Sequence, residues 1–109
     1  MTHDEFNKLF ADRFLKCRET LLSKAKQYAS DEDRLHNFYE GAILNCCTPE
    51  QYAHTLVTKQ IIALRDMIVQ DMFISQAVVD EKIGDIVNYY VLIEALIKER
   101  NSEARINEA

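Results

Sequence analysis

The chain has 109 residues, the length of a single domain, and contains only two glycines and one proline. Turn-rich β architectures need more of both, so the composition favours an all-α protein. The net charge of −5 argues against bulk nucleic-acid binding, which requires a basic surface.

The start of the chain is polar and does not read as a signal peptide, and no apolar run approaches the ~20 residues of a membrane span. Cys17, Cys46 and Cys47 lack metal-ligand spacing and are expected to be reduced thiols. The sequence therefore predicts a soluble, cytoplasmic protein with no membrane partner.

The first helix is predicted from about Thr2 to Tyr28. Thr2 and Glu5 have the spacing of a capping box, and apolar residues then recur at helical intervals. An acidic turn interrupts the pattern, and Ser30 is the expected N-cap of a second helix. We expect this second helix to stop near Cys47.

The third helix has the clearest start signal in the chain, at residues 48–51. A threonine N-cap, a proline at the first helical position and a glutamine at the capping-box position follow one another there. This helix is predicted to run to about Met72. Ser75 is the expected cap of a fourth helix, whose apolar pattern continues to Ile97, and the polar tail 100–109 is expected to fray.

Short connections between helices of this length favour antiparallel neighbours, so we expect one four-helix-bundle-like domain over residues 1–109. The fourth helix is apolar around much of its circumference. A small bundle buries one stripe per helix, so the surplus predicts a homo-oligomer. The alternative is that this helix lies at the centre of a single chain.

The most informative segment is 80–90, where a polar stripe lies beside an apolar helix face. Glu81, Asp85 and Asn88 follow at i, i+4 and i+7 and share this stripe. Two acids one turn apart repel weakly, so the stripe predicts a compensating metal ion, basic ligand or Lys/Arg. Gly84 lies between them and indicates a close approach to the backbone. A solvated acidic face is the alternative.

A second polar cluster lies where the first helix gives way to the second. Its members are Lys24, Lys26, Tyr28, Arg34, His36 and Asn37. The free backbone N–H groups at a helix start can bind an anion such as phosphate, and Tyr28 or Phe38 could stack on a base. A solvated turn is again the alternative, because neighbouring acids partly cancel the positive field.

Lys59 and Arg65 interrupt the apolar pattern of the third helix. They could face a ligand site, or they could neutralise Glu81 or Asp85 across a helix pair. No Ser-His-Asp or Cys-His arrangement and no glycine-rich phosphate loop is visible, so no catalytic residue is predicted.

Several short motifs follow one another between residues 19 and 96. They are Lys24-x-x-x-Tyr28, Asn37-Phe38, Thr48-Pro49-Glu50, Lys59, and Glu81-Lys82-Ile83-Gly84-Asp85-Ile86-Val87-Asn88-Tyr89. In this order they resemble the small helical nucleotide-modification-associated domains of phages and prophages. The resemblance implies a four- or five-helix protein of the bacterial host cell that is tied to phage nucleotide or DNA-base metabolism.

Together with the residue patterns, this resemblance defines an expected ligand-binding set. Its members are Lys24, Tyr28, Asn37, Lys59, Glu81, Asp85, Asn88 and Tyr89. The expected partner is a nucleotide-like small molecule, bound without a cofactor.

The segment 81–85 is also similar to the metal-binding helix of MazG-like all-α nucleoside triphosphate pyrophosphatases. That similarity implies Glu81 and Asp85 as ligands of Mg²⁺, a hard ion that prefers carboxylate oxygens. The chain departs from that pattern at Lys82, where a second acid would stand. Its first helix offers Glu19 but no Glu-Glu-x-x-Glu run.

Three functions therefore stand as expectations. The first is a phage-type protein that binds a nucleotide or nucleotide-derived signal and, in an anti-defence role, sequesters a host immune signal in pockets between subunits. The second is a Mg²⁺-dependent nucleotide pyrophosphatase. The third is a non-enzymatic protein–protein interaction module, which would show a large exposed apolar patch and no concave polar pocket.

Overall fold

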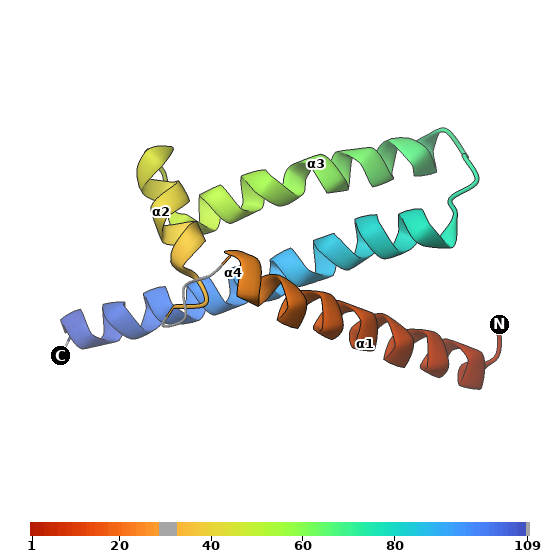
Figure 1. Cartoon of the computed structure of the whole chain (residues 1–109), viewed down its shortest axis with the longest axis horizontal. Coiled ribbons are helices and arrows are strands. Elements are labelled where there is room, and N and C mark those ends of the chain that lie inside the picture. Colours follow the sequence, from red (N-terminus) through yellow and green to blue (C-terminus); the bar gives the residue numbers. More distant parts are fainter. Residues whose placement is uncertain (29–32, 109) are drawn as a thin grey trace.

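The computed structural model describes residues 1–28 and 33–108, with side chains for 1–25 and 33–103. All regular structure in this part of the chain is helical, as the composition predicted. The helices are α1 (His3–Tyr28), α2 (His36–Leu44), α3 (Pro49–Val69) and α4 (Gln76–Glu108) (Figure 1). None of these helices is long and apolar enough, within the described residues, to cross a membrane.

The predicted helix starts are confirmed for α1, α3 and α4. The Thr48 hydroxyl accepts a hydrogen bond from the Gln51 N–H at 3.1 Å, and the Gln51 side chain accepts one from the Thr48 N–H at 2.9 Å. Thr2 and Glu5 form the same reciprocal pair before α1. The Ser75 hydroxyl accepts from the backbone N–H three residues further on, at 3.3 Å. These caps satisfy N–H groups that a helix start leaves open.

The second helix is shorter than predicted. It begins at His36 and not directly after Ser30, which itself lies outside the described residues. The Asp33 carboxylate accepts a hydrogen bond from the Leu35 N–H at 2.9 Å, a local turn that competes with helix formation. The helix ends two residues before Cys46, whose φ of 54° is the left-handed conformation of a helix C-terminus.

The ends of α3 and α4 also differ from the expectation. The third helix stops at Val69, short of Met72, because Asp71 adopts a φ of 53° and turns the chain. The fourth helix continues to Glu108, through most of the tail that was expected to fray. Residues 98–108 are mostly good helix formers and contain no glycine or proline, so nothing in the backbone ends the helix earlier.

The helices form an open, bundle-like arrangement. Figure 1 shows α3 and α4 as an antiparallel hairpin, α2 lying across the start of α3, and α1 crossing α4 obliquely. The main helix pairs in contact are α3 with α4, α1 with α4, and α2 with α3. The short α2 reverses the chain, so α1 and α4 run in a similar direction and only the α3–α4 pair has the predicted antiparallel sense.

This openness is visible in the dimensions. The radius of gyration is 16.6 Å and the molecule measures 51 × 30 × 29 Å. A compact chain of this length would have a radius of gyration of about 13 Å. The excess has two sources: α4 is 33 residues long, which at 1.5 Å per residue spans the longest dimension, and the first half of α1 diverges from the other helices (Figure 1).

The core lies between α2, α3 and α4. Its buried members are Leu35, Phe38, Ala53, Ile93 and Leu96. The first helix joins elsewhere, where the buried Cys17 thiol donates to the Gly84 carbonyl with an S···O distance of 3.8 Å. Because α4 packs against α3 and also against α1, most of its apolar circumference is accounted for within one chain.

Candidate functional site

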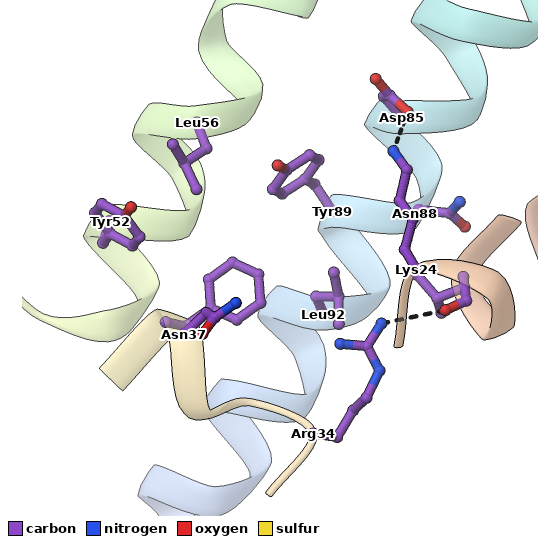
Figure 2. A pocket seen from close by; sticks show the side chains of 11 residues that line it. Lys24, Arg34, Asn37, Tyr52, Leu56, Asp85, Asn88, Tyr89 and Leu92 are labelled. Carbon is purple, nitrogen blue, oxygen red and sulfur yellow. Dashed lines mark hydrogen bonds and ion pairs between the residues drawn. The ribbon is translucent and has the colours of Figure 1, made fainter. Parts of the chain in front are cut away.

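The four helices meet around a cavity of about 310 Å³. That volume lies at the lower end of the range of about 300–1,000 Å³ typical of small-molecule sites. The lining residues come from α1, from α2 and the turn before it, from α3 and from α4 (Figure 2). They are Leu21, Lys24, Arg34, Asn37, Phe38, Tyr52, Leu56, Asp85, Asn88, Tyr89 and Leu92.

Two cations and one carboxylate set the charge of the cavity. The Lys24 ammonium lies 3.7 Å from one Asp85 oxygen, and the Gln60 amide donates to the other oxygen at 2.9 Å. The Arg34 guanidinium donates to the Leu21 carbonyl at 3.3 Å (Figure 2). This bond uses one of the five N–H donors of an arginine. The lining therefore carries a formal charge of +1 and retains unused donors.

Asn88 is the one buried polar residue of the described chain, with 8% of its surface exposed. Its side-chain amide makes no hydrogen bond to another described residue, yet no fully buried side-chain nitrogen or oxygen there lacks a partner. The amide therefore reaches open space. That space lies in the cavity and in a hollow of about 230 Å³ between α1 and α4, both of which Asn88 lines.

Aromatic rings form the apolar wall. Phe38 and Tyr89 meet edge to face with centroids 6.4 Å apart. The Tyr52 ring covers Gly41 of α2 so closely that a Cβ there would lie 2.2 Å from a ring carbon. The missing side chain of this helical glycine therefore allows Tyr52 to pack where it does.

The structure brings five of the predicted ligand-binding residues to this cavity: Lys24, Asn37, Asp85, Asn88 and Tyr89. Two of the other three, Lys59 and Glu81, do not line it. The Lys59 side chain is exposed on α3, and the Glu81 side chain is 59% exposed, 3.2 Å from the Lys82 ammonium. Tyr28 ends α1, and its side chain lies outside the described residues.

The alternative that Lys59 or Arg65 neutralises the acidic stripe is wrong for the described residues. Lys24 of α1 approaches Asp85, and Arg65 pairs with Asp66, its neighbour along the chain, at 3.1 Å. On α3 the side chain that reaches Asp85 is Gln60. Lys59 is rotated about 100° from it around the helix and points elsewhere.

Gly84 was expected to mark a close approach to the backbone. It is buried at the crossing with α1, but a Cβ there would find only the Arg13 guanidinium, at an ordinary 3.5 Å. The position that does require glycine is Gly41. The available signal for Gly41 was its position inside a predicted helix, where a glycine usually has a packing reason.

The structure does not bring the two expected Mg²⁺ ligands, Glu81 and Asp85, together at the cavity. Within the described chain, no three His, Cys, Asp or Glu side chains are grouped so that they could hold a metal ion. Glu81 lies outside the cavity, and Asp85 is already engaged by Lys24 and Gln60. The pair that spacing proposed as ligands thus does not converge on one point.

The expected ligand-binding set omitted several lining residues. Arg34 and Phe38 belong to the anion-binding site predicted at the start of the second helix, whereas Tyr52, Leu56 and Leu92 belong to no predicted site. Tyr52 and Leu56 lie one turn apart on α3, and this spacing predicts that both are core residues. Only the position of α2 decides that they also face an open space.

No family model matches the chain, and neither a curated protein nor a solved structure matches it. The site is therefore described by its own geometry. It is an aromatic cavity with a cationic rim inside an open, all-helical fold.

Proposed function

We propose that this cavity binds a nucleotide or a nucleotide-derived signalling molecule. The observation that supports this best is Asn88, a buried amide with no protein partner among the described residues. The amide faces open space in the free protein, and covering it without a hydrogen-bond partner would cost about 1–3 kcal/mol. A ligand that fills the cavity must therefore pair with it, and base edges carry the required donors and acceptors.

The cationic rim suits a phosphate. Lys24 and Arg34 flank the opening on α1 and the turn before α2, and both retain unused donors. Charge-assisted hydrogen bonds to phosphate are roughly twice as strong as neutral ones, and arginine can form two in parallel. The ammonium of Lys24 lies 3.7 Å from Asp85, beyond an ordinary hydrogen bond, so a phosphate can compete for it.

The apolar wall suits a base. Tyr52, Tyr89 and Phe38 present aromatic surface to the cavity. Stacking of a base on an aromatic side chain contributes about 1–3 kcal/mol. Asp85 can accept a hydrogen bond from a ribose hydroxyl or an exocyclic amino group. Cations for a phosphate and aromatic rings for a base are thereby available in one cavity, with Asp85 and Asn88 beside Lys24 (Figure 2).

Binding without chemistry is the form of the proposal that the lining favours. The single carboxylate, Asp85, is engaged by Lys24 and Gln60, and no histidine or cysteine lines the cavity. The cavity is formed within one chain, so sequestration of a host signal in an anti-defence role would not need a pocket between subunits.

The test is titration calorimetry with nucleoside monophosphates and triphosphates, cyclic dinucleotides and cyclic ADP-ribose products. At least one phosphate-bearing class should bind, and the matching nucleoside should bind at least tenfold more weakly. Recovery of the ligand unchanged, by mass spectrometry, is expected. An absence of heat across the whole panel would reject the proposal, and recovery of a hydrolysed product would indicate an enzyme instead.

A matched set of variants locates the site. Arg34→Gln and Lys24→Gln should each weaken binding roughly tenfold, because each removes a charge-assisted contact to phosphate. Lys59→Gln is the control, since it makes the same change on an exposed side chain outside the cavity. Equal effects of all three variants would mean that binding reports net charge and not this cavity.

A further inference from the structure

The first half of α1 carries an apolar surface that the rest of the chain leaves uncovered. We call Phe6, Leu9, Phe10 and Phe14 the aromatic stripe. Their exposed fractions are 54%, 51%, 56% and 48%, and they lie within one face of the helix. The Phe10 and Phe14 rings are in contact at a tilted angle, with centroids 4.7 Å apart. Leu9, at one edge of the stripe, also lines a hollow with Met1, Val79 and Ile83.

The area of this surface matches what a stable dimer needs. Each stripe residue leaves about 100 Å² in water, since a large aromatic side chain buries 150–250 Å² when covered. Two copies would therefore cover about 800 Å² of apolar surface. Slightly more than half of a typical interface is apolar, so about 800 Å² of apolar surface corresponds to a total buried area of about 1,400 Å². Specific protein interfaces begin at about 1,200 Å².

The charges beside the stripe identify the partner and its direction. Along one flank of α1 the order is Glu5, Lys8, Asp12, Lys16. In an antiparallel pair of α1 helices centred near Phe10, Lys8 meets Asp12 of the second copy. Glu5 then lies opposite Lys16, whose ammonium also lies 3.2 Å from Asp80 of its own chain. A parallel two-fold pair would instead set this flank against the opposite flank, which carries Asn7, Ala11 and Arg18. The flank therefore meets its own complementary charges only in the antiparallel sense.

We propose that the aromatic stripe is the interface of a two-fold symmetric homodimer in which the α1 helices of two copies pack antiparallel. A two-fold interface uses the same surface on both chains. This fits a stripe whose flanking charges are complementary to those of a second, antiparallel copy. This pairing also supports the half of α1 that diverges from its own chain (Figure 1).

Sedimentation velocity over a concentration series tests the surface. The native chain of 12.7 kDa should sediment at twice that mass, and Phe10→Glu should sediment as a monomer. Leu15→Glu is the matched control, because Leu15 is 53% exposed on the opposite side of the same helix and should leave the dimer intact. Circular dichroism verifies that each variant remains helical. A native monomer at all concentrations, or a Phe10→Glu dimer, overturns the proposal.

Charge reversal tests the direction. Lys8→Glu should weaken dimerisation roughly fivefold, and the double variant Lys8→Glu/Asp12→Lys should restore it. Within one chain the two residues form an i, i+4 ion pair at 2.7 Å, which the double variant also keeps. In a parallel dimer position 8 would face the opposite flank of the second copy, near Asn7 and Ala11, where it has no acidic partner, so the single variant would leave association unchanged. That result rejects the antiparallel arrangement, as does persistent weakening in the double variant.

Discussion

At the scale of single residues, Asn88 connects burial with function. Its amide is held in a largely apolar setting, where a leucine of similar size would be accommodated at no desolvation cost. Natural proteins accept such a cost where binding requires it. The residue should therefore limit the stability of the free protein and support ligand binding at the same time.

Asn88→Leu is expected to leave the free energy of unfolding unchanged or to raise it by about 1 kcal/mol, because a partly desolvated amide that makes no protein hydrogen bond is removed. Nucleotide affinity should fall at least tenfold in the same variant. Urea unfolding and calorimetry measure the two quantities. A loss of more than about 2 kcal/mol in stability would show that the amide supports the fold and not the site.

The two glycines provide a matched pair. Gly41→Ala should destabilise the protein by about 1–3 kcal/mol, because the new methyl group would overlap the Tyr52 ring and force it to move. Gly84→Ala should be neutral or stabilising by up to about 1 kcal/mol, because its Cβ meets only an ordinary contact and alanine favours helix. Urea denaturation compares them, and the reverse order would contradict the packing described for Tyr52.

At the scale of elements, a charged cluster ties the middle of α1 to the start of α4, in addition to the contacts of Cys17 and Lys24. Arg13 donates to Asp80 at 2.6 Å, and the Lys16 ammonium lies 3.2 Å from the same carboxylate. The hydrogen bond from Arg13, followed by that from Gln76, lowers the pKa of Asp80 from 3.8 to about 2. A carboxyl group with a lowered pKa contributes stability above its unfolded value and loses it as the pH falls towards the folded value.

Asp80→Asn should therefore lower the urea midpoint at pH 7. The difference from the native chain should shrink as the pH falls from about 4 to about 2, where the native carboxylate becomes protonated. Asp71→Asn makes the same chemical change at a position without an ion pair to a described residue, and asparagine tolerates its left-handed conformation. A difference for Asp80→Asn that persists at pH 2 would show that the ion pair is not its cause.

Helix starts were the best-predicted feature at this scale. The caps at Thr2, Thr48 and Ser75 are local, since each hydroxyl bonds to a backbone N–H three residues away. The start of α2 was missed because Asp33 forms a competing turn. The end of α2 was predicted near Cys46 and Cys47, close to the observed one, whereas the end of α3 was placed too late, because the left-handed residue there is Asp71 and not the glycine that usually ends a helix.

At the scale of the whole molecule, stability should be uneven. The α2–α3–α4 end contains the core, whereas α1 packs mainly against α4 and its first half diverges from the other described helices (Figure 1). Amides of residues 6–12 should therefore exchange with deuterium well before those of residues 86–96. Hydrogen exchange with mass spectrometry measures this at low protein concentration. Equal protection of the two segments would show that α1 is fully docked within one chain.

The sequence by itself determined the helical class, three helix starts and a short list of polar residues, because capping and periodicity depend on neighbours within a turn or two. It did not determine which of these polar residues meet. Glu81 and Asp85 lie on one stripe of α4, yet Asp85 lines the cavity and Glu81 does not. Where α1 crosses α4, and where α2 covers α3, depends on contacts between distant segments. Packing of those surfaces, which no local pattern encodes, decided the position of the cavity.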